Sequence, residues 1–100
     1  MRFLVVTRAK FPVPPSPELV DAMKAWADGH LASGRMEQTW NFAGVRGGGG
    51  LLNVESLDQL DEIMSGFPFG PYSEIDILPL TDLHESLDRV RSQLERMAGG

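Results

Sequence analysis

The sequence predicts a ferredoxin-like α+β domain with the element order β-α-β-β-α-β and an added C-terminal helix. Two observations support this prediction. Four short segments are rich in β-branched and aromatic residues, and two capped amphipathic segments follow the first and third of them. In this arrangement both helices cover one face of the sheet. The other face then needs a cover, which a second subunit usually supplies.

The first strand is expected over Arg2–Ala9, where RFLVVTRA places apolar side chains on both faces. Prolines exclude a helix or a central strand over 10–15. A helix is predicted over 16–33, with Ser16 as its N-cap and Gly34 at its end. One stripe of this helix carries Leu19, Met23, Trp26, Ala27 and His30.

Two further strands are predicted over 36–43 and 51–55, joined by a flexible hairpin connection over 44–50. On the first of these, Met36, Gln38, Trp40 and Phe42 are expected to share one face. A short helix then begins with the capping-box pattern of Ser56 and Gln59, and Gly66 ends it.

The last strand is predicted over 73–78, where apolar and polar residues alternate strictly and Pro79 stops the strand. A C-terminal amphipathic helix is predicted over about 82–97, after Thr81. Its narrow apolar stripe, at spacings typical of a coiled coil, consists of Leu83, Leu87, Val90, Leu94 and Met97. This stripe is surplus apolar surface, which could pack on its own chain or on a neighbouring subunit.

Composition sets limits on the class of protein. One hundred residues make one domain over 1–100, too apolar to be disordered. The absence of cysteine excludes disulfides and thiolate chemistry and fits a cytoplasmic location. A net charge of −5 disfavours nucleic acid and anionic membranes as partners. No apolar run is long enough to span a bilayer, and the N-terminal MRFLVVTRAK is expected to be a strand rather than a signal peptide.

Candidate catalytic groups lie close to the last predicted strand. Tyr72, Glu74 and Asp76 are spaced two residues apart, so they are expected on one face. If that face is enclosed, desolvation would raise the pKa of a carboxylate toward the range that a general base needs. The alternative is that these groups point to solvent or form ion pairs. His30 is a further candidate acid or base, although a lone histidine on an apolar stripe is more often a packing residue.

Candidate substrate-binding residues follow from the aromatic pattern. Trp26, Trp40 and Phe42 are expected to form an apolar cavity wall or, as the commoner alternative, a core or dimer interface. Asn41 and Arg46 could orient a carbonyl or carboxylate, although Arg46 also fits a solvated hairpin tip. No metal site is expected, because neither His30 nor His84 has ligand-type neighbours. The GGGG run lacks the Lys-Ser/Thr ending of a phosphate loop, and no serine-hydrolase motif is present.

The sequence resembles the muconolactone isomerase family at scattered positions over residues 1 to about 80. The matching positions are Met1, Phe3, Val5, Pro12, Val13, Thr39, Trp40, Pro71, Tyr72, Glu74, Ile75 and Asp76. The stretch VESLDQLDEIMSGFPFGPY also resembles the helix and the proline-rich exit of the family. There are two departures. Ala27 aligns with a glutamate that is the proposed base in the family, and GVRGGGG replaces a longer loop.

The resemblance implies a dimeric α/β barrel, formed when two ferredoxin-like sheets face each other, and sometimes larger rings. It also implies an isomerase or cyclase that moves a double bond in a small unsaturated lactone or carbonyl compound by proton transfer, without a cofactor. Glu74 or Asp76 would be the base, and Tyr72, His30 or Asn41 would polarise the carbonyl. Two alternatives keep the fold: a cofactor-free oxygenase of the antibiotic-biosynthesis type, and a ligand-binding or structural oligomer without catalysis.

Overall fold

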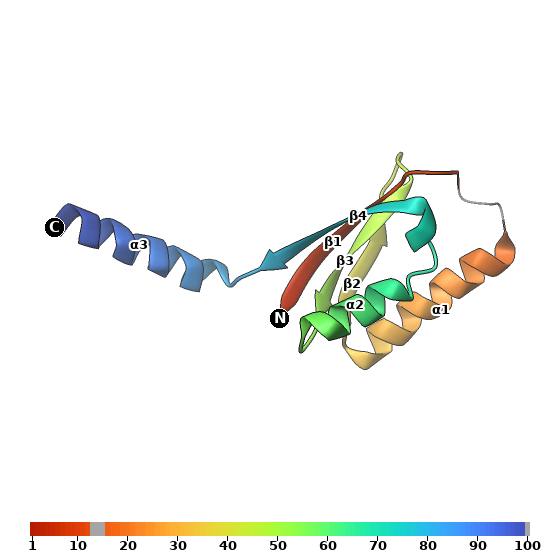
Figure 1. Ribbon diagram of the computed structural model, residues 1–100, viewed down its shortest axis with the longest axis horizontal. Coiled ribbons are helices and arrows are strands. Elements are labelled where there is room, and N and C mark those ends of the chain that lie inside the picture. Colours follow the sequence, from red (N-terminus) through yellow and green to blue (C-terminus); the bar gives the residue numbers. More distant parts are fainter. Residues whose placement is uncertain (13–15, 100) are drawn as a thin grey trace.

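The computed structural model describes residues 1–12 and 16–99, and the prediction made for 13–15 lies outside them. The elements in chain order are β1 (Arg2–Ala9), α1 (Pro17–Ser33), β2 (Met36–Asn41), β3 (Gly47–Asn53), α2 (Leu57–Ser65), a short 3-10 helix η1 (Gly70–Tyr72), β4 (Ser73–Leu80) and α3 (Leu83–Gly99) (Figure 1). The predicted order β-α-β-β-α-β with a C-terminal helix is therefore present.

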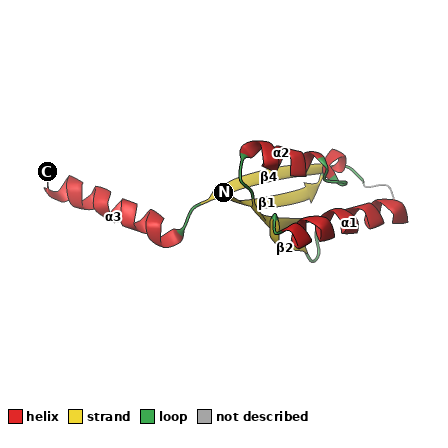
Figure 2. Cartoon of the chain, turned by 90° about the horizontal axis from the view of Figure 1, so that it is seen from below, coloured by secondary structure: helices red, strands yellow, loops and turns green. Residues whose placement is uncertain are grey.

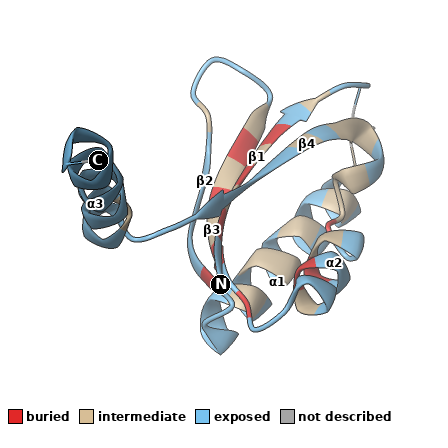
Figure 3. Cartoon of the chain, turned by 60° about the vertical axis from the view of Figure 1, so that its left-hand side comes forward, coloured by how far each residue is buried: buried red, intermediate tan, exposed pale blue. Residues whose placement is uncertain are grey.

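The four strands form one antiparallel sheet in the order β2-β3-β1-β4, which is the ferredoxin-like arrangement that the sequence predicts. Helices α1 and α2 lie together on one side of this sheet (Figure 3). The buried cluster between the two layers consists of Phe3, Val5, Met36, Leu52, Val54, Leu60 and Ile63. Phe3 and Val5 of β1 belong to it and Thr7 is buried beside them, because alternate side chains of a strand share one face.

The predicted caps of the helices are present. The Ser16 hydroxyl accepts a hydrogen bond from the Leu19 N–H at 3.2 Å, and the Ser56 hydroxyl accepts one from the Gln59 N–H at 3.1 Å. Gly34 ends α1 at φ 80°, a left-handed conformation that favours glycine. Local sequence therefore fixes where both helices of the body begin.

The glycine run is strand rather than a flexible hairpin connection, which corrects the prediction for 44–50. Gly47–Gly50 pair with β1, and Gly48–Gly50 pair with β2 as well. A Cβ atom on Gly48 would lie 2.4 Å from the Trp40 carbonyl oxygen, and one on Gly49 would lie 2.8 Å from the Val5 carbonyl oxygen. The neighbouring backbones thus approach too closely for a side chain, and glycine is needed here for packing rather than for flexibility.

Three strand boundaries and one face also differ from the predictions. β2 ends at Asn41 rather than at residue 43, and β3 ends at Asn53 rather than at residue 55. Pro79 lies within β4, because this edge strand pairs only with β1 and has a free side where no donor is needed. A register irregularity between Met36 and Gln38 places Met36 on the helix-covered face and Gln38 on the other, so the two do not share a face.

Helix α3 projects away from the rest of the molecule beyond the end of β4 (Figures 1 and 2). The molecule measures 62 × 28 × 22 Å, and its radius of gyration is 17.6 Å. A compact chain of this length has a radius of gyration of about 13 Å. The apolar stripe of α3 is exposed along its whole length, from Val90 at 47% to Met97 at 77%.

The sheet face opposite α1 and α2, called the open face here, also carries apolar side chains. Leu4 on β1 pairs with Leu51 on β3 and Leu78 on β4, which forms a row of leucines across the sheet. Leu78 is 51% exposed. No helix in 1–12 and 16–99 has the length and hydropathy that crossing a membrane requires.

Candidate active-site cavity

A cavity of about 460 Å³ lies between helix α1 and the glycine-rich part of β3. Its walls come from β1, the N-terminal half of α1, β2, the hairpin loop after β2, and the segment that follows α2. Gly48 and Gly50 share the helix-covered face with Thr7 and Val5, their partners on β1. Because glycine has no side chain, this part of the sheet leaves open the space that an ordinary strand would fill. The glycine run therefore helps to form the floor of the cavity.

One wall of the cavity is aromatic and fixed in place. The Trp26 indole N–H donates a hydrogen bond to the Ile63 carbonyl oxygen at 3.2 Å. The ring centroid of Trp26 lies 5.1 Å from that of Phe67, which in turn lies 6.2 Å from that of Phe69. All three aromatic residues line the cavity. Since the only polar group of Trp26 is already engaged, this wall offers an apolar surface to a ligand.

The hydroxyl groups of the cavity are occupied by the protein itself. Thr7 donates a hydrogen bond to the Gly48 carbonyl oxygen at 3.3 Å, Thr39 to that of Gly49 at 2.9 Å, and Ser73 to that of Phe69 at 2.8 Å. These bonds join the strands and the η1 segment around the cavity. They leave the threonine and serine hydroxyls with limited capacity to bind a ligand.

Asn41 and Arg46 are the polar lining residues that remain available. Within 1–12 and 16–99, neither the Asn41 amide nor the Arg46 guanidinium takes part in a side-chain hydrogen bond or ion pair. Asn41 ends β2, and Arg46 precedes β3, so both belong to the hairpin end of the cavity. Together they can donate hydrogen bonds to an oxygen atom of a bound molecule.

The five predicted substrate-binding residues all line this cavity: Trp26, Trp40, Asn41, Phe42 and Arg46. Sequence reasoning missed Met23, Met64, Phe67 and Phe69, which also line it. Met23 lies on the apolar stripe of the first helix, and that stripe is the signal that could have identified it. Phe67 and Phe69 lie in a turn-rich segment without periodicity, so no pattern marked them.

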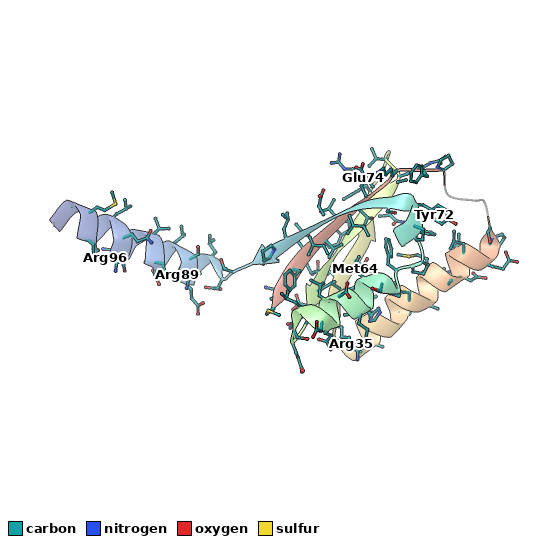
Figure 4. All side chains as sticks on the ribbon, viewed as in Figure 1. Arg35, Met64, Tyr72, Glu74, Arg89 and Arg96 are labelled. Atoms are coloured by element: carbon teal, nitrogen blue, oxygen red, sulfur yellow. The ribbon has the colours of Figure 1, made fainter. Side chains whose placement is uncertain are left out.

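The four predicted catalytic residues do not line the cavity. Glu74 and Asp76 pair with Arg8 and Val6 on β1, so they lie on the open face, and both are exposed in the single chain. Tyr72 ends η1 rather than belonging to the strand, and its carbonyl oxygen accepts a hydrogen bond from the Lys10 N–H at 2.7 Å. Figure 4 shows Tyr72 and Glu74 at the end of β4 that is opposite to α3.

His30 packs behind the aromatic wall. Its ring meets that of Trp26 edge-on, with centroids 5.1 Å apart. Burial lowers the pKa of His30 from its ordinary value of 6.5, and the positive charge of nearby Arg35 lowers it further. The structure therefore favours a neutral imidazole that packs against Trp26 and does not line the cavity.

Two other features bear on the chemistry of the site. Ala27 lies beside Trp26 on α1, carries no titratable group and does not line the cavity. Among the residues that the structure describes, no group of three or more histidine, cysteine, aspartate or glutamate residues is placed to hold a metal ion.

The fold and the cavity define a ferredoxin-like α+β protein with a largely apolar cavity between helix and sheet. Residues 1–86 match the muconolactone delta-isomerase family, and the chain belongs to that family. It is 34% identical over 64 residues to a muconolactone delta-isomerase of Rhodococcus opacus, covering 64% of this chain and 69% of the relative. A crystal structure of muconolactone isomerase matches with a TM-score of 0.67 and 26% identity, covering 82% of this chain and 90% of that one. The predicted family resemblance is thus confirmed, and it supports an isomerase function.

Proposed function

We propose that the protein is an isomerase or cyclase that acts by proton transfer on a small unsaturated carbonyl or lactone compound. The observation that carries the proposal is the 460 Å³ apolar cavity, with Asn41 and Arg46 at one end, in a chain of an isomerase family. Its volume is within the range of about 300–1,000 Å³ of small-molecule sites. The aromatic wall would hold an unsaturated ring, and the two polar side chains would hold its oxygen.

Asn41 and Arg46 would stabilise the transition state. When a proton leaves the carbon next to a carbonyl group, negative charge develops on the carbonyl oxygen. Donors that are already in place strengthen their hydrogen bonds to that oxygen as the charge grows, which lowers the barrier. The Asn41 amide is a neutral donor, and the Arg46 guanidinium adds a positive charge.

Glu74 is the proposed proton acceptor, with Asp76 as the second choice. No carboxylate or imidazole of the described residues lines the cavity. Glu74 belongs to the open face, where it lies opposite Arg8, and it directly follows Ser73, which lines the cavity. In this proposal its side chain therefore reaches the substrate around the end of β4. Asp76 lies two residues further along the strand. In this proposal His30 and Tyr72 do not contact the substrate. His30 packs against Trp26, and the Tyr72 carbonyl oxygen accepts a hydrogen bond from the Lys10 N–H.

The proposed assembly is a homodimer or a larger homo-oligomer that covers the open face. The row of Leu4, Leu51 and Leu78 supports it, since a single chain leaves these side chains in contact with water. Cover over this face would also remove water from Glu74 and Asp76.

The test uses muconolactone in deuterated water, with NMR to follow both double-bond movement and deuterium incorporation. The wild-type protein is expected to catalyse both above the rate in buffer alone. The Glu74→Gln variant should lose about 10²–10⁴-fold in rate, which is the usual contribution of a general base. Asp76→Asn, on the same strand face, tests the second choice and should lose much less; a larger loss in Asp76→Asn than in Glu74→Gln would make Asp76 the base. Equal rates in all three proteins would rule out Glu74 as the base.

A ligand-binding role without catalysis is the second candidate. The absence of a titratable base from the described cavity lining favours it. Under this alternative, muconolactone and related lactones would bind without deuterium incorporation. Consumption of dissolved oxygen with a hydroxyaromatic compound would instead identify a cofactor-free oxygenase.

A further inference from the structure

Helix α3 carries an apolar surface that the described chain leaves uncovered. The helix projects beyond the end of β4, and none of the residues 83–99 is buried (Figures 1 and 2). Most of it lies beyond residue 86, where the match to the isomerase family ends. The matched family region therefore does not describe what covers the apolar stripe of α3.

The stripe of α3 has the form of a seam between two helices. Leu87 and Leu94 occupy the a positions of a heptad repeat, and Leu83, Val90 and Met97 occupy the d positions. A helix that packs on a globular core usually has a wider apolar face, whereas a stripe of a and d positions alone is covered by one further helix of the same kind. A second copy of this chain supplies such a helix.

The charges of α3 favour an antiparallel arrangement of two copies. Residues 82–88 contain three acidic residues and neither lysine nor arginine, whereas 89–97 contain three arginines and one glutamate. Parallel helices would place halves of like charge side by side, and like charges across an interface repel each other. Antiparallel helices place the acidic half of each copy beside the basic half of the other.

The helix macrodipole accounts for only part of this charge order. It favours acidic residues in the first turn and basic residues in the last, and its effect falls off beyond these turns. Glu85 and Arg96 fit that explanation. Asp88 and Arg91 do not, because they lie in the interior of α3, on the same side of the stripe. Arg91 forms an exposed ion pair with Glu95 at 3.1 Å, and Asp88 takes part in no ion pair within 1–12 and 16–99.

We propose that α3 pairs with α3 of a second copy of this chain, in antiparallel orientation about a two-fold axis. The register that places Leu83 opposite Leu94 of the second copy covers both stripes. In this register Arg91 of each helix lies beside Asp88 of the other, which forms two reciprocal ion pairs. The stripe is only about two heptads long, shorter than a coiled coil that is stable by itself, so the helix pair alone forms at high protein concentration.

Disulfide cross-linking tests the orientation, because the chain contains no cysteine of its own. Leu83→Cys and Leu94→Cys are made in the full chain, and each is oxidised alone and in an equal mixture. We expect a disulfide-linked dimer in the mixture and little in either variant alone. The two Leu83 positions of an antiparallel pair are about 16 Å apart along the axis, which is too far for a disulfide.

Ser92→Cys is the matched control for cross-linking, because Ser92 lies on the side of α3 opposite the stripe. It should not cross-link with itself or with either of the other variants. Cross-linking of Leu83→Cys with itself as fast as in the mixture would overturn the antiparallel orientation. A mixture that cross-links no faster than Ser92→Cys would overturn the helix pair.

Charge reversal tests the two ion pairs. Arg91→Glu, added to both cysteine variants, should slow formation of the mixed dimer about 10-fold at low salt, and Asp88→Arg added as well should restore the rate. Arg89→Glu is the matched control, since it makes the same change of charge on the side of α3 away from the stripe. Far-UV circular dichroism separates a loss of pairing from a loss of helix. Equal slowing by Arg91→Glu and Arg89→Glu would overturn the assigned ion pairs.

The helix pair can be distinguished from the proposed assembly through the open face. Leu78→Glu changes the open face and leaves the stripe of α3 intact, so the cysteine variants should still form the mixed dimer in that background at high protein concentration. Loss of the cross-link in Leu78→Glu would show that the open face covers α3, which would overturn the helix pair. A protein that cross-links as expected and has no isomerase activity would retain this interface and lose only the proposed function.

Discussion

The Trp26 indole N–H donates a hydrogen bond to the Ile63 carbonyl oxygen at 3.2 Å, and this bond joins the middle of α1 to the end of α2. The same carbonyl oxygen accepts the N–H of Gly66. Trp26 also contacts Phe67 and His30 through its ring. One side chain thus connects both helices to the aromatic wall of the cavity.

Replacing Trp26 with phenylalanine removes this hydrogen bond and part of the packed volume. The Ile63 carbonyl oxygen keeps its bond from Gly66, so the loss of unfolding free energy should be moderate, about 1–3 kcal/mol. Urea denaturation followed by circular dichroism would measure it. The control is Trp40→Phe, since Trp40 is 38% exposed and should cost less. An equal loss in both variants would contradict the role given to Trp26.

The glycine strand gives a second prediction, with a control on α1. A Cβ atom on Gly48 would lie 2.4 Å from a backbone oxygen, so Gly48→Ala should lower the unfolding free energy by about 1–3 kcal/mol. On Gly50 the closest contact would be 3.2 Å, and the loss from Gly50→Ala should be smaller. Gly29 has nothing within 4 Å and lies within a helix, so Gly29→Ala should stabilise by about 0.5–1 kcal/mol. Denaturation midpoints would rank the three, and any other order would contradict this account.

Local signals predicted most of the fold, whereas the glycine strand required the tertiary structure. Ser16, Gly34 and Ser56 act within one or two turns of chain, so their capping roles can be inferred from nearby residues. A run of glycines has no side-chain pattern, and composition alone favours a loop. Its role as a strand depends on the backbones of β1 and β2, which come from distant parts of the sequence.

The candidate site could be predicted only where a local sequence pattern marks its residues. Trp26 and Trp40 were identified because aromatic residues on element faces often form cavities, and both line this one. Glu74 and Asp76 could be placed on one strand face by alternation. Alternation does not show which face of the sheet the helices cover, because that depends on tertiary packing. Helices α1 and α2 cover the face opposite to the one that carries Glu74 and Asp76.

The pH dependence of stability should include a contribution from His30. Burial lowers the pKa of its folded state below the ordinary value of 6.5, so the unfolded chain binds more protons as the pH falls below that value. The contribution of His30 is therefore fully present above about pH 6.5 and is lost as the pH falls toward the lower pKa of the folded state. Melting temperatures at pH 7.5, 6.5 and 5.5 should decline toward acid, and less steeply in His30→Gln.

The control for this pH dependence is His84→Gln, because His84 is exposed on α3. The profile of this variant should follow that of the wild type. Profiles that coincide for His30→Gln and the wild type would show that burial of His30 does not contribute.

A second acidic decline in melting temperature should begin below pH 4.5. The backbone N–H of Glu18 and then the Ser16 hydroxyl lower the pKa of the Glu18 carboxyl from its ordinary value of 4.5.

The exposed leucines lead to a prediction about assembly. Most of the stability of a helix in a protein comes from packing its apolar face, and here the stripe of Leu83, Leu87, Val90, Leu94 and Met97 is exposed. The open face likewise exposes Leu78. We expect sedimentation at micromolar concentration to find a dimer or larger oligomer. Leu78→Glu should dissociate it, because a carboxylate within an apolar interface loses its hydration without gaining a partner.

A comparison with Leu87→Glu shows where α3 packs. If its stripe packs on a neighbouring subunit, this variant should also weaken association; if it packs back on its own chain, the oligomer should persist with lower thermal stability. Arg89→Gln, on the same helix but outside the stripe, should leave the sedimentation coefficient unchanged. A wild-type monomer at these concentrations would contradict the proposed barrel. The open face would then need another cover, and Glu74 would stay exposed to solvent instead of enclosed as the proposed catalysis requires.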